Sequence, residues 1–232
     1  MTAMTPAGST RTVGRALDLL AEVCAEGAIS LSECARRAGL PLSTALRLLR
    51  TLESAGFVVR DPGGSFSAGP RLIQLGAYAL GRQSLVRLAQ PAMRRIVAAT
   101  RESTYLATRG PNDTAIYIAM VEGTHSVRHT SWVGRSVPMA KLAVGRALSD
   151  DLDEYPYVAE RDRFEPDVTA IVAPIHWARG VAGALSVLGP TYRIDDEAMH
   201  EYGRIVSAEA RAIGEQLGLA RSEPTLREVT AE

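Results

Sequence analysis

The sequence predicts an α+β fold made of a helical N-terminal part that ends in a β-hairpin and a C-terminal antiparallel sheet covered by helices. Three observations predict it. Residues 30–57 read as two helices joined by a tight turn, residues 57–68 read as two strands around a turn cluster, and strand-like segments recur from residue 104 onwards. Between the two parts, residues 70–100 have the apolar spacing of helices, which predicts a helical linker.

The first helix of the pair has its own start and stop signals. Ser30 precedes Glu33 by three residues, the spacing of a capping box in which each side chain bonds the other residue's backbone N–H. Gly39 can adopt the left-handed conformation that ends a helix, and Pro41 prevents its continuation. A second helix is therefore expected from about Leu42.

The second helix separates into an apolar and a polar face at 100° per residue. Hydroxyls and arginines make up the polar face, and Glu53 near the helix end is its exception. Hydroxyl groups reach phosphates, and arginine pairs with guanine edges or phosphate oxygens, so this face suits a DNA groove. The alternative is an ordinary amphipathic helix with two solvated arginines. The polar face consists of Ser43, Thr44, Arg47, Arg50 and Thr51.

A predicted hairpin follows the second helix. Phe57–Arg60 is strand-like, Asp61–Gly64 is a turn cluster and Ser65–Ala68 is the returning strand. Helix, turn, helix and hairpin form a winged helix-turn-helix, whose second helix enters the major groove of DNA. The expected DNA contacts are Ser43, Thr44 and Arg47 on bases or backbone, with Arg50 and the wing residue Arg60 on phosphates.

A series of short motifs follows in order between residues 12 and 80: Arg15-Ala16-Leu17-Asp18-Leu19-Leu20, Leu31-Ser32-Glu33, Gly39-Leu40-Pro41, Ser43-Thr44, Arg47-Leu48-Leu49, Arg60-Asp61-Pro62 and Gly69-Pro70-Arg71-Leu72. In the order and spacing of these motifs, residues 12–80 resemble the DNA-binding module of the IclR family of bacterial transcriptional regulators. The resemblance implies a ligand-responsive regulator and no enzyme: a repressor that binds a pseudo-palindromic operator in double-stranded DNA as a homodimer or a dimer of dimers. Two-fold proteins read half-sites about one helical turn, or a multiple of it, apart.

Composition agrees with a DNA-binding regulator of the cytoplasm. The 232 residues have a formal net charge of zero, which argues against indiscriminate coating of nucleic acid, while the N-terminal part is mildly basic. Cys24 and Cys34 lack the spacing of a zinc or redox site, so we expect buried, reduced thiols. No signal peptide or membrane-length apolar run is present, and we expect no membrane partner, metal or cofactor.

The expected domain boundaries are a disordered N-terminus at 1–11, the winged domain with the start of the linker at 12–82, an effector-binding and oligomerisation domain at 83–220, and a flexible tail at 221–232. In the C-terminal part Asp195 is expected to cap a long helix that reaches about Leu219. The other expected elements are helix 84–100, strands 104–109, 115–121 and 126–132, helix 142–148, a strand beginning near Tyr157, and strands 169–175 and 181–188.

This part resembles the GAF/PAS-like ligand-sensing domain of the same family, with one large departure. Only Ser149–Pro156 connect the expected helix 142–148 to the next strand, so roughly 40 residues of the family's usual helices are absent. A cavity that lacks this wall is expected to be shallower, more open, or completed by another subunit.

The resemblance also implies an effector site over the sheet, where a small or aromatic acid is held by N–H groups at a helix start. Several of the family's polar anchors are replaced here, so either the effector is more apolar or the domain no longer senses a ligand. Without ligand contact, Ser186 would bond a neighbouring backbone group and Glu160 would be a surface charge. The matching positions are Ala143, Val144, Gly145, Glu160, Ala170, Ser186 and Leu188.

Two other readings of this part involve histidines. His125 and His129 are four residues apart, but without further ligands we expect solvated histidines rather than a metal site. An enzyme with Ser186 as nucleophile and His176 or His129 as base is a remote alternative, because no Gly-x-Ser-x-Gly motif is present. A DNA-binding protein that has no ligand is the third alternative.

Overall fold

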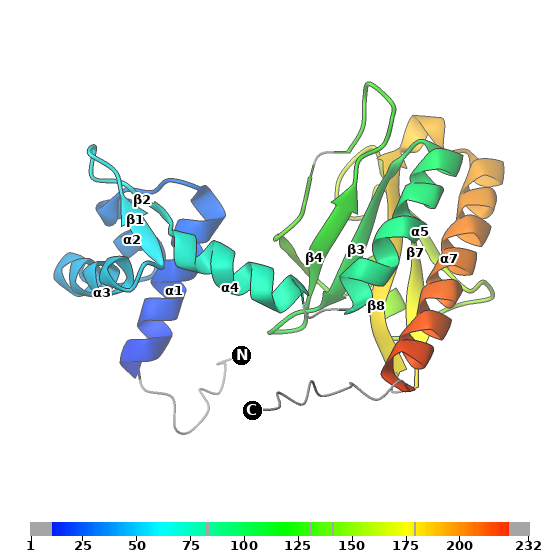
Figure 1. Cartoon of the computed structure of the whole chain (residues 1–232). Helices are drawn as coiled ribbons and strands as arrows, with labels where there is room; N and C mark the ends of the chain where they lie inside the picture. The colour runs from blue at the N-terminus through cyan, green and yellow to red at the C-terminus, as the bar shows by residue number, and fades with distance from the viewer. Residues whose placement is uncertain (1–10, 82–83, 130, 141, 179, 223–232) are drawn as a thin grey trace, which may run out of the picture. The chain divides into compact units, whose positions relative to one another are not determined.

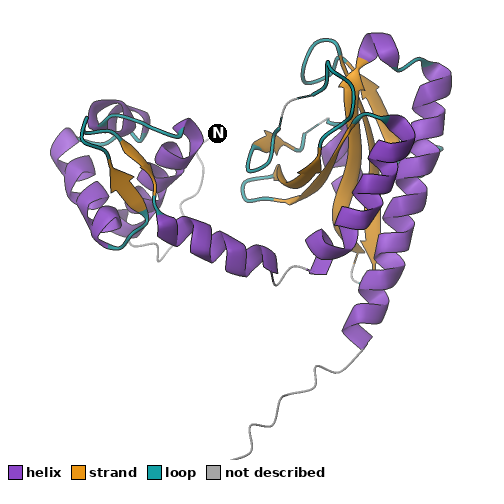
Figure 2. Cartoon of the chain, turned by 45° about the horizontal axis from the view of Figure 1, so that its top comes forward, coloured by secondary structure: helices purple, strands orange, loops and turns teal. Residues whose placement is uncertain are grey.

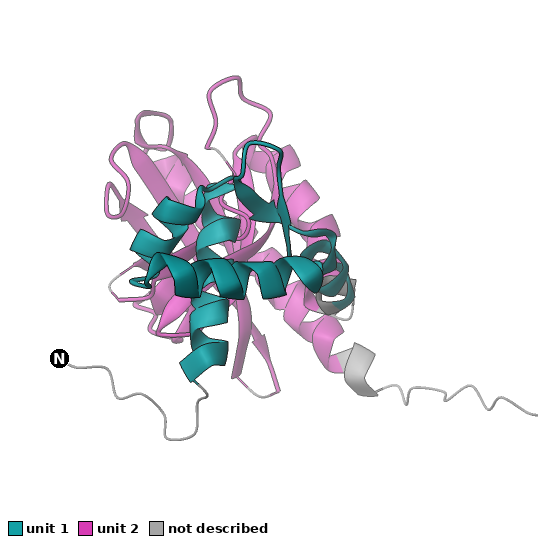
Figure 3. Ribbon diagram, turned by 90° about the vertical axis from the view of Figure 1, so that its left-hand side faces the viewer, with its two compact units in different colours: residues 1–82 teal, residues 83–232 magenta. Residues whose placement is uncertain are grey.

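The computed structural model of the chain describes residues 11–222 except 82, 83, 130, 141 and 179. The chain divides into two compact units, residues 1–82 (unit 1) and residues 83–232 (unit 2), which Figure 3 distinguishes by colour. Of the ends expected to be disordered or flexible, 1–11 and 221–232, residues 1–10 and 223–232 lie outside the described residues. Arg11 belongs to the first helix and residues 221 and 222 to the last one, so these positions of the expectation are wrong.

Unit 1 is a small helical domain with a two-stranded hairpin (Figure 1). Its core is apolar, and Leu19, Leu49 and Phe66 are completely buried. Phe66 also bonds the backbone of Ile29, which ties the hairpin to the segment before the second helix. The bounds are α1 Arg11–Glu26, α2 Leu31–Arg37, α3 Leu42–Ser54, β1 Val58–Arg60, β2 Phe66–Ala68 and α4 Pro70–Gly81.

The start of α2 confirms one half of the predicted capping box. The Ser30 hydroxyl accepts a hydrogen bond from the Glu33 backbone N–H at 3.3 Å. The Glu33 carboxylate, however, accepts from Arg36 and Arg37, so the reciprocal half of the box is wrong. Two guanidinium groups outcompete a backbone N–H because charge-assisted hydrogen bonds are stronger. At the other end Gly39 has φ +62°, as the predicted turn requires.

The two cysteines differ in their environments. Cys34 on α2 is buried, and its Sγ donates to the carbonyl of Leu19 at 3.7 Å. Cys24 is exposed, so the expectation that both thiols are buried is wrong for this residue. Its neighbour Val23 takes the inward position on α1 instead.

Unit 2 is built on a six-stranded antiparallel sheet with the strand order β5-β4-β3-β8-β7-β6. Helices α5 and α7 lie side by side on one face of the sheet (Figures 1 and 2), and the short α6 packs on the opposite face. Asp195 caps α7 as predicted, accepting from the Ala198 N–H at 2.8 Å. The bounds are α5 Ser84–Thr100, β3 Ser103–Arg109, β4 Thr114–Val121, β5 Ser136–Pro138, α6 Ala143–Leu148, β6 Val158–Arg161, β7 Val168–Trp177, β8 Gly180–Pro190 and α7 Asp196–Ser222.

The strand expected at 126–132 is wrong. The described residues of this segment form a loop, and the strand beside β4 is instead β5, which pairs Val137 with Ala115. Apolar spacing misled the prediction because Trp132 and His129 are buried by side-chain packing rather than by a strand ladder. No helix among the described ranges is both long and apolar enough to cross a bilayer.

Candidate nucleic-acid interface and effector cavity

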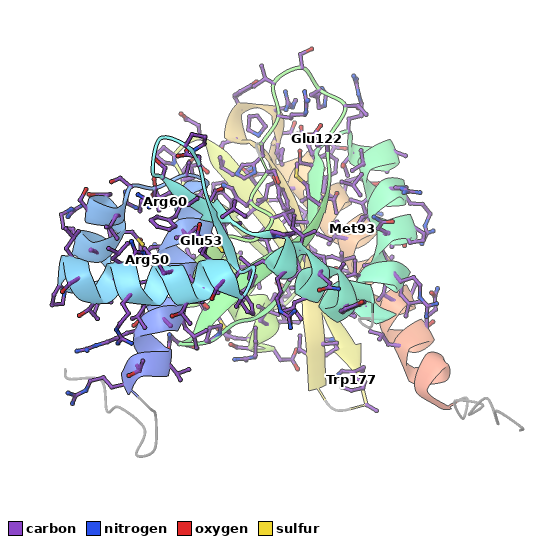
Figure 4. The ribbon with its side chains drawn as sticks, turned by 60° about the vertical axis from the view of Figure 1, so that its left-hand side comes forward. Arg50, Glu53, Arg60, Met93, Glu122 and Trp177 are labelled. Atoms are coloured by element: carbon purple, nitrogen blue, oxygen red, sulfur yellow. The ribbon has the colours of Figure 1, made fainter. Side chains whose placement is uncertain are left out.

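The outer face of α3 presents the predicted DNA-reading residues. Ala45, Leu48 and Leu49 are buried and fix the rotation of the helix. The opposite face therefore points to solvent, and Arg50 is labelled there in Figure 4. Thr44 is half-buried at the edge of this face. A shallow hollow of about 690 Å³ on this face, counting space open to solvent, is lined by Ser43, Leu46, Arg47, Arg50, Thr51 and Ser54.

The arginines of α2 form ion pairs, whereas the arginines of α3 do not pair with any described residue. Arg36 and Arg37 on α2 bind the carboxylate of Glu33, and these hydrogen bonds lower the pKa of Glu33 to about 2. The guanidinium groups of Arg47 and Arg50 form no ion pair with any described residue. The uncompensated positive charge of the helix-turn-helix therefore lies on α3, which is the helix expected in the groove.

Arg60 lies on the hairpin, as the wing prediction requires (Figure 4). Its guanidinium sits 5.5 Å from the centroid of the Phe66 ring, and its Nε donates to the Gly64 carbonyl at 3.4 Å. The turn itself is held by Asp61, which accepts from the Ser65 N–H at 2.9 Å. Its own hairpin thus restricts the orientation of the Arg60 side chain.

Unit 2 holds a narrow cavity between the sheet and the start of α6. It measures about 430 Å³, counting the space open to solvent at its mouth. Five of the seven predicted effector residues line it: Ala143, Val144, Glu160, Ala170 and Leu188. The other lining residues are Tyr117, Trp132, Val137, Leu142, Arg163, Phe164, Glu165 and Val168.

Strand pairing explains which predicted residues meet. Glu160, Ala170 and Leu188 pair across β6, β7 and β8, so they form one row on one face of the sheet. Ser186 pairs with Val172 in the next row of the same face. Because side chains on one face repeat every second residue, Ser186 lies one step along the strands from the cavity wall.

Glu160 is half-buried rather than a free surface charge. Its Oε2 accepts a hydrogen bond from the backbone N–H of Ala143 at 2.8 Å. The surface-charge interpretation of Glu160 is therefore wrong. The first N–H group of α6, which was expected to receive the anion of a ligand, already binds a carboxylate of the chain itself.

Gly145 and Ser186 are placed outside the cavity wall. A methyl group on Gly145 would lie 1.9 Å from the carbonyl oxygen of Met139, so glycine is required there for close backbone packing. Ser186 is completely buried, and its hydroxyl has no hydrogen-bond partner among the described residues. The expectation that this hydroxyl bonds a neighbouring backbone group is wrong.

The arrangement does not support the remote hydrolase. The Nε2 of His176 donates to the Asp150 carboxylate, 2.7 Å from Oδ1, and the ring Nδ1 of His129 lies 2.7 Å from the Tyr105 hydroxyl. Since the buried hydroxyl of Ser186 meets no base in the part of the chain that is described, it cannot be activated as a nucleophile.

Aromatic residues that the sequence did not single out close the cavity. The ring centroid of Trp132 lies 5.6 Å from that of Tyr117 and 5.5 Å from that of Phe164. His129 connects the segment of Trp132 to the segment of Phe164: its Nδ1 lies 2.7 Å from the Tyr105 hydroxyl, and its Nε2 lies 3.4 Å from Glu165. His129 is thus buried, and the expectation that it is solvated is wrong. Among described residues no group of His, Cys, Asp and Glu could hold a metal ion.

The fold and these two sites define a class of protein: a winged helix-turn-helix transcriptional regulator with a separate small-molecule-binding domain. Comparison with known families gives the particular family. The profile described as "IclR helix-turn-helix domain" matches residues 12–62, and the one described as "Bacterial transcriptional regulator IclR C-terminal" matches residues 77–160. Together they cover more than half of the chain, which belongs to the IclR family of transcriptional regulators and is not an enzyme.

Individual relatives agree with this assignment. The transcriptional repressor IclR of Escherichia coli K12 is 27% identical over 246 positions, which cover 89% of this chain and 89% of that protein. The alignment is longer than the chain, as expected if this chain lacks a segment of the family.

Solved structures share the fold. An IclR transcriptional regulator from Alicyclobacillus acidocaldarius has a TM-score of 0.77 at 24% identity and covers 90% of this chain and all of that chain. An IclR homologue from Microbacterium hydrocarbonoxydans, complexed with 4-hydroxybenzoate, has a TM-score of 0.73 at 23% identity and covers 91% of this chain and all of that chain.

Proposed function

We propose that this chain is a ligand-responsive repressor of the cytoplasm, which binds a pseudo-palindromic operator as a dimer or a dimer of dimers. Residues 12–82 serve as the DNA-binding domain and residues 83–220 as the effector-binding and oligomerisation domain. The observation that carries the proposal is the outer face of α3, where Arg47 and Arg50 are exposed on a helix locked into a winged fold.

In this proposal the two arginines have different tasks. Arg47, with Ser43 and Thr44 near the start of α3, contacts base edges, because N-terminal residues of a recognition helix reach deepest into the groove. Arg50 and the wing residue Arg60 contact phosphates, which position the protein without reading sequence.

Exposed apolar side chains on unit 1 support self-association. Val13 and Leu17 are exposed on α1, and Ile73 and Tyr78 are exposed on α4. Exposed apolar side chains gain free energy when a second copy covers them. A two-fold dimer would present two copies of α3 to two half-sites.

The cavity of unit 2 is the proposed effector site, with a small organic molecule that has an apolar or aromatic body as its ligand. Support comes from the wall, where the aromatic rings of Tyr117, Trp132 and Phe164 meet the apolar row of Ala170 and Leu188. Such a ligand changes DNA binding only if it has different affinities for the DNA-competent and incompetent forms.

The test is binding to labelled duplexes from the DNA that flanks the protein's own gene, across a salt series. The natural protein should bind one pseudo-palindrome tightly, and Arg47→Ala should weaken that binding. Arg36→Ala is the matched control, since it removes the same charge from a side chain engaged by Glu33. Weak binding that is indifferent to sequence, or equal losses in both variants, would refute the assignment of α3.

A second experiment separates the ligand-responsive regulator from a regulator that no longer senses. Candidate metabolites are titrated into the protein–operator complex while release of the labelled DNA is followed. Release by one compound at a saturable concentration supports an effector role for the cavity. Specific DNA binding that no compound changes favours the alternative without a ligand.

A further inference from the structure

We propose that Leu46 on α3 reads the C5-methyl group of a thymine in the operator. Leu46 is not one of the polar residues from which the DNA-reading face was predicted, and a contact of this kind sets base preference rather than affinity for phosphates. The inference rests on the proposed DNA-reading role of α3 and adds a specificity-determining residue to it.

Leu46 lies at the surface of α3 instead of in the core. Three other apolar residues of the helix take its buried positions. Leu46 is half-buried, and among the described residues it belongs neither to the core of unit 1 nor to the half-buried apolar residues that pack against that core. It instead lines the hollow on the outer face of α3, in the company of Ser43 and Arg50.

The apolar surface continues towards the start of α3. Leu42, the first residue of the helix, is 53% exposed. Because residues four apart are neighbours on a helix surface, Leu42 and Leu46 form an apolar strip beside the polar residues of the same face. The N-terminal residues of a recognition helix are the ones that contact base edges, so this strip begins where base contacts are made.

The chemistry of the hollow identifies the partner of this leucine. Arg47 and Arg50 line the same hollow and form no ion pair with any described residue, so the partner is anionic. A leucine side chain gains free energy only where the partner offers it an apolar group. Double-stranded DNA combines both properties, since the thymine methyl is an apolar group among the donors and acceptors of the major groove.

The position of Leu46 along the helix predicts where the thymine lies. Leu46 and Arg47 are adjacent, and a helix rises about 1.5 Å per residue whereas base pairs are stacked about 3.4 Å apart. We therefore expect the thymine within about two base pairs of the base that Arg47 reads.

The test removes the methyl group from the DNA. Each thymine of the operator is replaced in turn by uracil, in both half-sites together, which deletes the C5-methyl group and keeps the base pairing. Binding of the full-length natural protein is measured at one salt concentration. A thymine near the Arg47 position should be sensitive, with a loss of affinity of about 4-fold for each methyl group removed.

Leu46→Ala identifies the side chain that contacts the methyl group. This variant should bind the thymine duplex more weakly than the natural protein does and should no longer distinguish it from the uracil duplex, as a double-mutant cycle requires of two groups in contact. A change of DNA stiffness caused by uracil would act equally on both proteins. Leu75→Ala is the matched control, because it truncates a leucine that is 43% exposed on α4 and should keep the discrimination.

Three results would overturn the role of Leu46: no sensitive thymine near the Arg47 position, the same discrimination in Leu46→Ala as in the natural protein, or its loss in Leu75→Ala as well. The regulator itself would stand in these cases if the operator is bound specifically and Arg47→Ala weakens that binding. If no duplex is bound specifically, the proposed function and the role of Leu46 fail together.

Discussion

Glu102 is the residue whose replacement should most clearly expose how unit 2 holds its cavity loop. It is completely buried just before β3 and accepts hydrogen bonds from Arg193, at 2.5 Å from Nε and 3.1 Å from Nη2. The same guanidinium donates to the Val127 carbonyl at 2.9 Å, and His125 lies 3.6 Å from Glu102. The pair therefore ties the loop that leads to Trp132 onto the sheet.

Glu102→Gln keeps the shape of the side chain and removes its charge. Removing one partner of a buried ion pair costs about 3–5 kcal/mol when the other stays buried. The side chain of Arg193 is 22% exposed, so water can hydrate part of its guanidinium. We therefore expect a loss of about 2–3 kcal/mol, which lowers the melting temperature of a unit of this size by about 4–12 °C.

The assay is thermal unfolding followed by Trp132 fluorescence in the Trp177→Phe background. Both tryptophans of the chain belong to unit 2, so the signal reports this unit alone. Glu201→Gln is the control, since it breaks an exposed pair with Arg204 and should cost less than about 1 kcal/mol. Equal melting temperatures for the two variants would refute the anchoring role of Glu102.

Four further results are expected. Arg50→Ala should weaken binding to DNA of every sequence by the same factor and reduce the slope of log affinity against log salt by about 1 per subunit, as measured in binding isotherms. Arg47→Ala should instead relax the base preference at one position of each half-site in the same assay. Gly145→Ala should destabilise unit 2 by about 1–3 kcal/mol in the Trp132 assay, because the added methyl meets a backbone carbonyl. Hydrogen bonds from two arginines depress the pKa of Glu33 from 4.5 to about 2, so the ionised Glu33 stabilises the folded state above about pH 4.5 and this contribution is lost as the pH falls towards 2. The free energy of unfolding of Glu33→Gln should therefore fall less than that of the natural protein over this pH range, in chemical unfolding followed by circular dichroism. Ser186→Ala should leave the melting temperature unchanged or raise it, since the deleted hydroxyl has no hydrogen-bond partner in the described structure.

The elements of unit 1 could be predicted because their signals are local. Ser30 and Gly39 mark the ends of α2 through hydrogen bonds and dihedrals within a few residues. The apolar spacing of α3 likewise fixes which face is buried. Local spacing could not predict the partners of the Glu33 side chain. Its carboxylate accepts hydrogen bonds from Arg36 and Arg37 rather than from the backbone N–H of the capping box, and residue spacing does not say which donor binds more strongly.

The cavity could be predicted only in part, since it depends on pairing between distant strands. Glu160, Ala170 and Leu188 meet because β6, β7 and β8 are neighbours in register, which no local pattern specifies. The family resemblance supplied those positions. It could not reveal that Glu160 turns back onto Ala143, nor that Trp132 reaches the site from a loop rather than from a strand.

The connection between α6 and β6 is short, and the structure shows what closes the cavity in place of the missing helices. Without the family's additional helices, a wall that is shallower, more open or borrowed from another subunit was expected. In this chain two loops close the cavity, through the Trp132–Phe164 ring contact and the 3.4 Å approach of His129 to Glu165. Phe164 remains 51% exposed, so its side of this closure buries less apolar area than the side of Trp132, which is 7% exposed. Segments with few buried contacts open at low free-energy cost, so under the proposed effector role of the cavity we expect a ligand to enter past Phe164 rather than past Trp132.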